Sequence, residues 1–234
     1  MKLALVTHAE HPQLRHTMPN VWPEYMHHDP VVTTFWPRLY DLYPDFQLWV
    51  VDRDVRQTVA YACTLPVRWD GELSPRGVDW AMSNGASGEP TTLCAIVVGI
   101  APDYRGTGLS SALLRRMTAL AAAHGLDGLI APVRPTWKER YPLSPIESYL
   151  RWRREDGLLY DPWLRTHERL GAEVLGAAPR SLTVPGTRAE WESWTELTYP
   201  EDGDYVVPGA LAPVRFEGGR GVYVEPNVWM RHPV

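Results

Sequence analysis

The sequence lacks several features that would define whole classes of protein. It has no long block of basic residues, its formal net charge is −5 and its isoelectric point is near 5.9, so we do not expect a nucleic-acid partner. No apolar run reaches the length of a membrane span, and the N-terminus lacks a signal-peptide pattern. We therefore expect a cytoplasmic protein that does not bind membranes.

Cysteine and phenylalanine are also scarce. The two cysteines, Cys63 and Cys94, lie in apolar strand-like runs, which favours buried thiols in a reducing compartment over a disulfide. No cluster of histidine and cysteine has the spacing of a metal site, so we expect no metal. Against 3 phenylalanines stand 11 tryptophans and 11 tyrosines, whose polar groups suit a pocket or an interface as well as a core.

The remaining composition is that of a globular chain. Its 234 residues, 44% of them hydrophobic, are enough for one sizeable core, and no internal repeat or second domain boundary is visible. Periodicity predicts strands at 2–7, 46–51, 58–67, 93–100 and 128–133, helices at 31–42, 109–124 and 162–170, and a strand region at 172–184. Thr187 to Glu190 forms a capping box, and strand-like runs at 205–216 and 222–230 suggest a hairpin.

The most informative stretch runs from Leu93 to His124. An apolar, β-branched strand ends before Pro102, the turn Arg105-Gly106-Thr107-Gly108 follows, and a helix with one apolar face begins at Leu109. The first N–H groups of a helix have no intrahelical partner, and the helix dipole makes that end positive. Glycines let a phosphate approach the backbone, so this unit predicts a phosphate or pyrophosphate site.

The type of phosphate site can be narrowed. A P-loop is excluded because no Gly-Lys-Ser/Thr follows, and Gly106-x-Gly108-x-x-Ser111 meets the dinucleotide fingerprint only loosely. The alternative without a ligand is an ordinary strand, turn and helix, in which the glycines only allow the chain to turn. The better match is Arg105-x-x-Gly108-x-Ser110 after the strand.

This pattern resembles the acetyl-CoA motif of the GCN5-related N-acetyltransferases (GNAT), which reads Gln or Arg, two residues, Gly, one residue, then Gly or Ala. Ser110 departs mildly at the last position. The run from Trp163 to Ala172 is similar to the later helix of that family. The resemblance implies an α+β fold with a mixed, mostly antiparallel central sheet flanked by helices. We expect one domain over 1–234, with an insertion at about 134–161 and a C-terminal elaboration at about 185–234.

The resemblance also implies a function and a binding site. It implies an acyl-CoA-dependent N-acyltransferase, with acetyl-CoA as the most expected co-substrate, acting on a small amine-containing acceptor by direct transfer. Main-chain groups of Val98, Gly99 and Ile100 would meet the acyl and pantetheine part. The pyrophosphate would be held by the turn and the first helical residues, namely Arg105, Gly106, Thr107, Gly108, Leu109, Ser110 and Ser111.

The catalytic residues are less clearly marked. The family frequently has a tyrosine acid four residues before the glycine that ends the late helix, and here that position is His167, for which packing is an alternative. Tyr160 and Tyr141, in the insertion, are candidates for a replacement acid. Glu225 is a candidate base because it follows two strand residues and precedes a proline. Other carboxylates, Asp79, Glu147, Asp156 and Asp161, stay open as bases, as does a water relay.

Two further expectations concern the acceptor and the competing function. The aromatic insertion and the connection at 70–90, which reads as a lid or as disorder, are expected to form the acceptor pocket. A non-catalytic acyl-CoA-binding module of the same fold is the alternative function, and a homodimer stays open.

Overall fold

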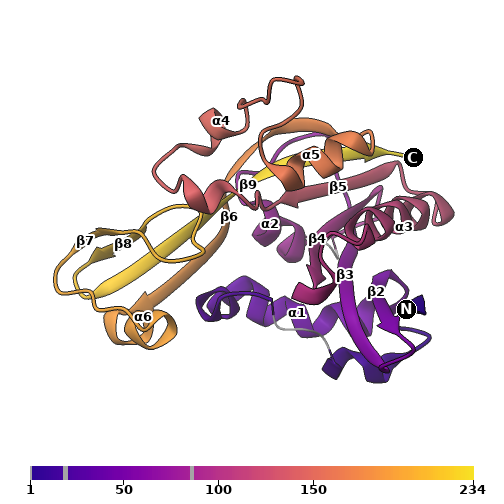
Figure 1. The fold of residues 1–234 in the computed structure, drawn as a ribbon, viewed down its shortest axis with the longest axis horizontal. Helices are drawn as coiled ribbons and strands as arrows, with labels where there is room; N and C mark the ends of the chain where they lie inside the picture. Colours follow the sequence, from indigo (N-terminus) through magenta and orange to yellow (C-terminus); the bar gives the residue numbers. More distant parts are fainter. Residues whose placement is uncertain (1, 18–20, 85–86) are drawn as a thin grey trace.

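The structure is a computed structural model that describes residues 2–17, 21–84 and 87–234 (Figure 1). Its strands are β1 (Leu3–Thr7), β2 (Gln47–Asp52), β3 (Gln57–Val67), β4 (Thr92–Ile100), β5 (Gly128–Val133), β6 (Glu173–Thr187), β7 (Gly203–Tyr205), β8 (Val214–Glu217) and β9 (Arg220–Pro233). Its α-helices are α1 (Pro30–Leu42), α2 (Gly77–Asn84), α3 (Leu109–Ala123), α4 (Ile146–Tyr149), α5 (Pro162–Arg169) and α6 (Arg188–Thr195). Short 3₁₀ turns are η1 (Pro12–Thr17), η2 (Glu24–His28), η3 (Pro44–Phe46), η4 (Pro102–Tyr104) and η5 (Lys138–Arg140).

The strands form one mixed sheet. Its order is β1-β2-β3-β4-β5-β9-β8-β7, and β6 pairs with β9 beside this path. Among the described strands, β4 and β5 are the one parallel pair, and the other pairs are antiparallel. The expected α+β fold with a mostly antiparallel sheet and extra C-terminal strands is confirmed.

Helices cover both faces of this sheet. Successive strand residues point to opposite faces, so Tyr61 and Cys63 of β3 join a core with α1, α2 and α6, whereas Ala60 and Ala62 join a core with α3, α4 and α5. No helix in the described part of the chain is long and apolar enough to cross a membrane.

Local sequence signals placed most elements correctly. The capping box at Thr187 and Glu190 starts α6, and Cys63 and Cys94 are free, buried thiols. The expected single strand over 205–216 is wrong, since β7 ends at Tyr205 and β8 begins only at Val214. Pro208 and Pro213 lie between them, and proline cannot donate to a ladder.

The connection at 70–90 also differs from a plain loop. It contains α2, whose Val78, Ala81 and Met82 are buried in the core, so this part is neither a lid nor disordered. Positions 85 and 86 of the connection lie outside the described residues. The segment 134–161 is packed too, with Ile146, Tyr149 and Leu159 buried.

A buried pair of carboxyl groups joins α1, α2 and β6. One oxygen of Asp29 accepts from the backbone of Val31 (2.8 Å) and Val32 (2.9 Å) and so caps α1, while the other accepts from Thr183 N of β6 (2.7 Å). Asp79, in the first turn of α2, is hydrogen-bonded to Asp29. Burial, and then the charge of Asp29, raise the pKa of Asp79 to about 8. Asp79 is therefore protonated at neutral pH and shares its proton with Asp29.

This pair predicts a pH-dependent stability. The unfolded chain releases the Asp79 proton near pH 4, whereas the folded chain holds it to about pH 8, so stability from this group is lost as the pH rises between these values, by up to ~1.4 kcal/mol per pH unit. Asp79→Asn keeps a donor toward Asp29 but does not titrate. The free energy of unfolding of this variant, measured in urea, minus that of wild type, is expected to increase from pH 5 to pH 8, because only wild type loses stability over this range.

A matched control is Asp127→Asn, because Asp127 is exposed. Its curve shows the effect of removing one exposed carboxylate, and the pH dependence for Asp79→Asn should exceed that effect. If the Asp79→Asn and wild-type curves ran parallel from pH 5 to pH 8, the shared proton would be wrong.

Candidate active site

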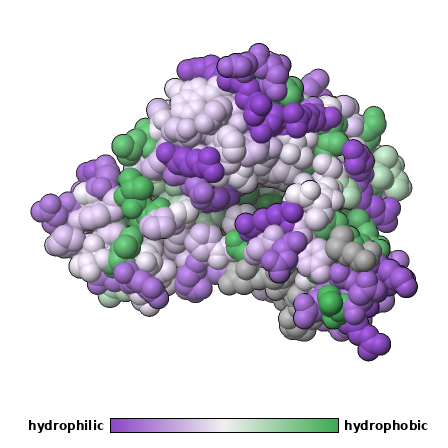
Figure 2. Space-filling model, in the orientation of Figure 1, coloured by the Kyte–Doolittle hydropathy of each residue, from purple (hydrophilic) through white to green (hydrophobic). Residues whose placement is uncertain are grey.

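The central feature of the site is a fork between β4 and β5. The two strands pair only at Leu93 with Leu129 and at Cys94 with Ile130. Beyond these pairs β4 continues along β3 and β5 continues along β9, so the facing edges separate. Backbone N–H and C=O groups on separated edges need another partner. Figure 2 shows a hollow with an apolar floor in this part of the molecule.

A β-bulge lies where the fork opens. Cys63 of β3 pairs with Val97 and Thr64 pairs with Ala95, which leaves Ile96 as an extra residue in β4. A bulge re-aims the backbone groups around it. Ile96 was not predicted as a site residue, because a bulge depends on the register with β3 and has no composition signal of its own.

The predicted strand residues lie on the open arm. Val98 and Ile100 are half-buried, and Gly99 is buried under Tyr61. A Cβ atom at Gly99 would lie 2.3 Å from Tyr61 Cε1, so a glycine is required there for packing. Trp22 Nε1 donates to the Tyr61 hydroxyl at 3.1 Å. This arrangement fixes Tyr61 on the face of the fork opposite α3.

The predicted glycine turn leads directly from this arm into α3. Gly106 and Gly108 have φ of 75° and 86°, the left-handed region that favours glycine, and no heavy atom lies within 4 Å of a Cβ built on either. Gly108 is the N-cap of α3 without a side-chain cap, and the first turn holds no acidic residue. The exposed Arg105 adds positive charge. An anion therefore finds open space, unpaired N–H groups and a favourable dipole.

Side-chain hydrogen bonds and a buried leucine fix the conformation of the glycine turn. Thr107 Oγ1 donates to the carbonyl of Tyr104 at 2.6 Å, and the Tyr104 hydroxyl donates to Asp52 Oδ2 at 2.9 Å. Ser110 and Ser111 are half-buried, and Leu109 is buried in the core beneath the turn. The backbone that faces solvent is thus fixed before any ligand binds.

Two of the predicted acid candidates lie together. The hydroxyls of Tyr141 and Tyr160 are 2.9 Å apart, and Trp152 packs edge-on against both rings. The hydrogen bond to Tyr141 raises the pKa of Tyr160. Tyr160 therefore keeps its proton at neutral pH and can donate it. It directly precedes Asp161, the N-cap of α5.

His167 lies elsewhere. Its Nδ1 is 2.9 Å from His232 Nε2, its Nε2 is buried without a partner among the described residues, and Trp163 packs against its ring. Burial lowers its pKa well below the ordinary value, so the ring is neutral. Because His232 pairs with Leu129, His167 is beside the closed end of the fork. Packing accounts for this position, and the role of His167 as the acid stays a prediction.

Glu225, the candidate base, forms an ion pair at the other arm of the fork. It is fully buried on β9, and its Oε2 accepts from Arg134 Nε at 2.9 Å and from the Tyr223 hydroxyl at 3.0 Å. Arg134 is the first residue after β5, so the pair lies at the open end. Its guanidinium also donates to the carbonyl of Gly209 and packs over Trp22. Glu225 Oε1 has no partner among the described residues.

A polar chain extends from this pair along β9. Asn227 Nδ2 donates to the carbonyl of Pro132 (3.1 Å) and to Ser181 Oγ (2.9 Å), and Ser181 Oγ also accepts from Val78 N at 3.0 Å. Asn227 was not predicted as a site residue. The alternation of Glu225 and Asn227 around Pro226 is a signal that could have found it, since these two side chains share one face of the strand.

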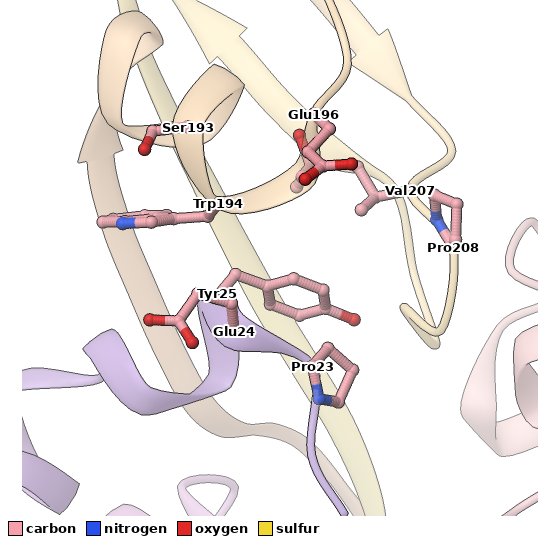
Figure 3. A pocket seen from close by; sticks show the side chains of 9 residues that line it. Pro23, Glu24, Tyr25, Ser193, Trp194, Glu196, Val207 and Pro208 are labelled. Atoms are coloured by element: carbon pink, nitrogen blue, oxygen red, sulfur yellow. The ribbon is translucent and has the colours of Figure 1, made fainter.

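Tyr25 lies between this region and a surface cavity of about 390 Å³, which is formed by η2 and α6 (Figure 3). The exposed Glu24 and Glu196 line the cavity together with Trp194. In Figure 3 the Tyr25 ring forms one wall, and its hydroxyl points away from Trp194. That hydroxyl is buried and has no partner within the described residues. Tyr25 thus separates the cavity from the ion pair of Arg134 and Glu225.

The comparisons with known proteins agree with this geometry. A profile of the acetyltransferase (GNAT) family matches residues 9–140. The arginine N-acetyltransferase avaD of Aspergillus versicolor is 32% identical over 253 residues, covering 94% of this chain and 87% of that protein.

Two solved structures share the fold over the full chain. The loading GNATL domain of CurA from Lyngbya majuscula superposes with a TM-score of 0.67 at 17% identity, covering 100% of this chain and 98% of that one. The GphF GNAT-like decarboxylase in complex with isobutyryl-CoA gives 0.63 at 14% identity, covering 100% and 99%. Identities this low show the fold alone. The family profile and the match to avaD show more: this chain belongs to the acetyltransferase (GNAT) family of enzymes.

Proposed function

We propose that this GNAT acyltransferase uses acetyl-CoA as its acyl-CoA co-substrate and acetylates the amine of a small acceptor, arginine or a compound like it. The observation that supports this most is the continuity of three parts: the unpaired arm of β4, the exposed glycine turn and the uncapped start of α3. The arginine acceptor of avaD supports the choice of a small amine. The buried thiols of Cys63 and Cys94 support a reducing, cytoplasmic compartment, and a homodimer stays a prediction.

We assign the groups that thioester aminolysis requires to the following residues. The turn and α3 would hold the phosphates, and the free edge of β4 would align the acyl and pantetheine part. The amine nitrogen forms a bond to the carbonyl carbon as the C–S bond breaks, one proton leaves the nitrogen, and the sulfur takes one. Tyr160 is our proposed donor of that proton, with Tyr141 positioning its hydroxyl. Glu225 stays the candidate base.

The primary test measures CoA release with acetyl-CoA and a panel of amines, and identifies the product by mass. Release that depends on an amine, with an increase of one acetyl group in its mass, supports the proposal. The neutral, packed His167 at the position of the family tyrosine favours the alternative of a non-catalytic acyl-CoA-binding module. Acetyl-CoA binding without product from any amine would establish that alternative.

Gly108→Asp tests the cofactor turn. The new side chain would occupy the open space at the start of α3, at a φ of 86°, and add negative charge where the phosphates are proposed to bind. Calorimetry should show loss of acetyl-CoA binding. Gly125→Asp is the matched control: Gly125 also has a left-handed φ, 68°, and open space, but it follows the opposite end of α3. Equal loss in both variants would mean that strain, and not the site, was responsible.

Tyr160→Phe tests the acid. Removing only the hydroxyl should lower kcat by about 10² or more, the size of a general-acid contribution, while KM for acetyl-CoA changes by less than about twofold because binding is untouched. His167→Gln, measured beside it, should have the smaller effect on kcat. A larger loss in His167→Gln than in Tyr160→Phe would assign the acid to His167 instead.

A further inference from the structure

We propose that Arg134 and Glu225 recognise the carboxylate and the amino group of a free α-amino acid, so that the acceptor is acetylated on its α-nitrogen. This inference rests on the proposed function and names its substrate class. It rests on two polar atoms of this ion pair, one on each side chain, that have no hydrogen-bond partner among the described residues.

On Glu225 the unused atom is a hydrogen-bond acceptor. Its side chain is fully buried, and Arg134 and Tyr223 both donate to Oε2. Oε1 is buried as well but receives no hydrogen bond from any described residue. A buried carboxylate oxygen without a donor is costly, and native proteins rarely keep one without a purpose. An ammonium group supplies the missing donor.

On Arg134 the unused atom is a donor. Its Nε donates a hydrogen bond to Glu225, and its Nη2 donates to the carbonyl of Gly209. The guanidinium group also packs over the ring of Trp22. Nη1 has no partner among the described residues, and the side chain keeps 17% exposure. A guanidinium N–H without a partner, on a side chain that is partly exposed, is a donor for a carboxylate, which Arg can bind through two parallel hydrogen bonds.

The charges of the pair decide what it binds. Because the pair is neutral overall, a lone cation would be repelled by Arg134 and a lone anion by Glu225. A zwitterion, with an ammonium and a carboxylate joined through one carbon, carries the two groups that these two atoms would bind. The Oδ1 atom of Asn227, on the same face about 7 Å along β9, is also buried without a described partner and can accept a further N–H.

The pair lies where the reaction requires it. Arg134 follows the open arm of β5, and Asn227 donates to Pro132 on that arm, so a bound amino group faces the fork. Tyr25 covers the other side: its ring packs edge-on against Tyr223 at 5.5 Å, and its hydroxyl is buried and unpaired within the described residues. Tyr25 closes the site off from the cavity of Figure 3.

The test compares α-amino acids with the same amines lacking the carboxylate. Initial rates are measured for arginine against agmatine, lysine against cadaverine, and phenylalanine against phenethylamine. Wild type should prefer the amino acid of its best pair by about tenfold or more in kcat/KM. Equal kcat/KM for amino acid and amine would overturn the inference while leaving the acetyltransferase function intact. Absence of product from every amine would instead contradict the proposed function itself.

Arg134→Lys tests whether Arg134 is responsible for the preference for an amino acid over the matching amine. A lysine keeps a cation beside Glu225 but cannot donate to two carboxyl groups in the fork geometry of a guanidinium. KM for the amino acid should rise about tenfold, and KM for the matching amine should change less than about twofold. A merely structural role would raise both equally, which would contradict the assignment.

Two further variants serve as controls, one for misfolding and one for the loss of a charge outside the proposed site. In Arg134→Gln/Glu225→Gln the pair is neutral and can still hydrogen-bond, so no unpaired charge is buried, and this variant should fold, as shown by its melting temperature. Because it also removes the candidate base, its preference is read from the dissociation constants of amino acid and amine in the presence of CoA, and it should bind the two equally. Glu196→Gln removes a carboxylate from the cavity of Figure 3 and should keep the preference. Loss of the preference in Glu196→Gln, or its persistence in the double variant, would overturn the inference.

Discussion

The separation of β4 from β5 is the constraint on which the rest of this structure depends. Two parallel strands that share only two residue pairs expose backbone groups on both arms, and such groups need another partner. The bulge at Ile96 and the antiparallel partners on either side, β3 and β9, keep the arms apart. In our proposal, this open edge, more than any one side chain, would receive an extended acyl-CoA.

The two faces of the fork have different chemistry. On the face of α3, the uncapped helix start and the glycine turn provide positive potential and free N–H groups. On the opposite face, β9 lines up buried polar groups, Glu225 and Asn227, among aromatic rings. In our proposal, the phosphates would therefore be bound mainly by backbone groups, whereas the acceptor would be recognised by specific side chains.

Local sequence signals made part of the fold and of the candidate site predictable. The strand, the turn of Gly106 and Gly108 and the amphipathic α3 are contiguous, so their arrangement follows from short-range geometry. The fork is not predictable in this way, because it depends on β9 pairing with β5 from about 100 residues away. Asp29 and Asp79 meet only through the packing of α1 on α2, and Tyr25 lies in a 3₁₀ turn that has no periodic pattern. The position of His167 was predictable, but its burial against His232 was not.

Hydrogen exchange of the backbone amides, with and without acetyl-CoA, tests the central claim most directly. Acetyl-CoA should slow exchange in two segments, the open arm of β4 from Ala95 to Ile100 and the turn and first helical residues from Gly106 to Ala112. Amides of β7 and β8, far along the sheet, should exchange unchanged. Protection confined to other parts of the chain, or no protection at saturating acetyl-CoA, would contradict the claim that the fork and the turn receive the acyl-CoA.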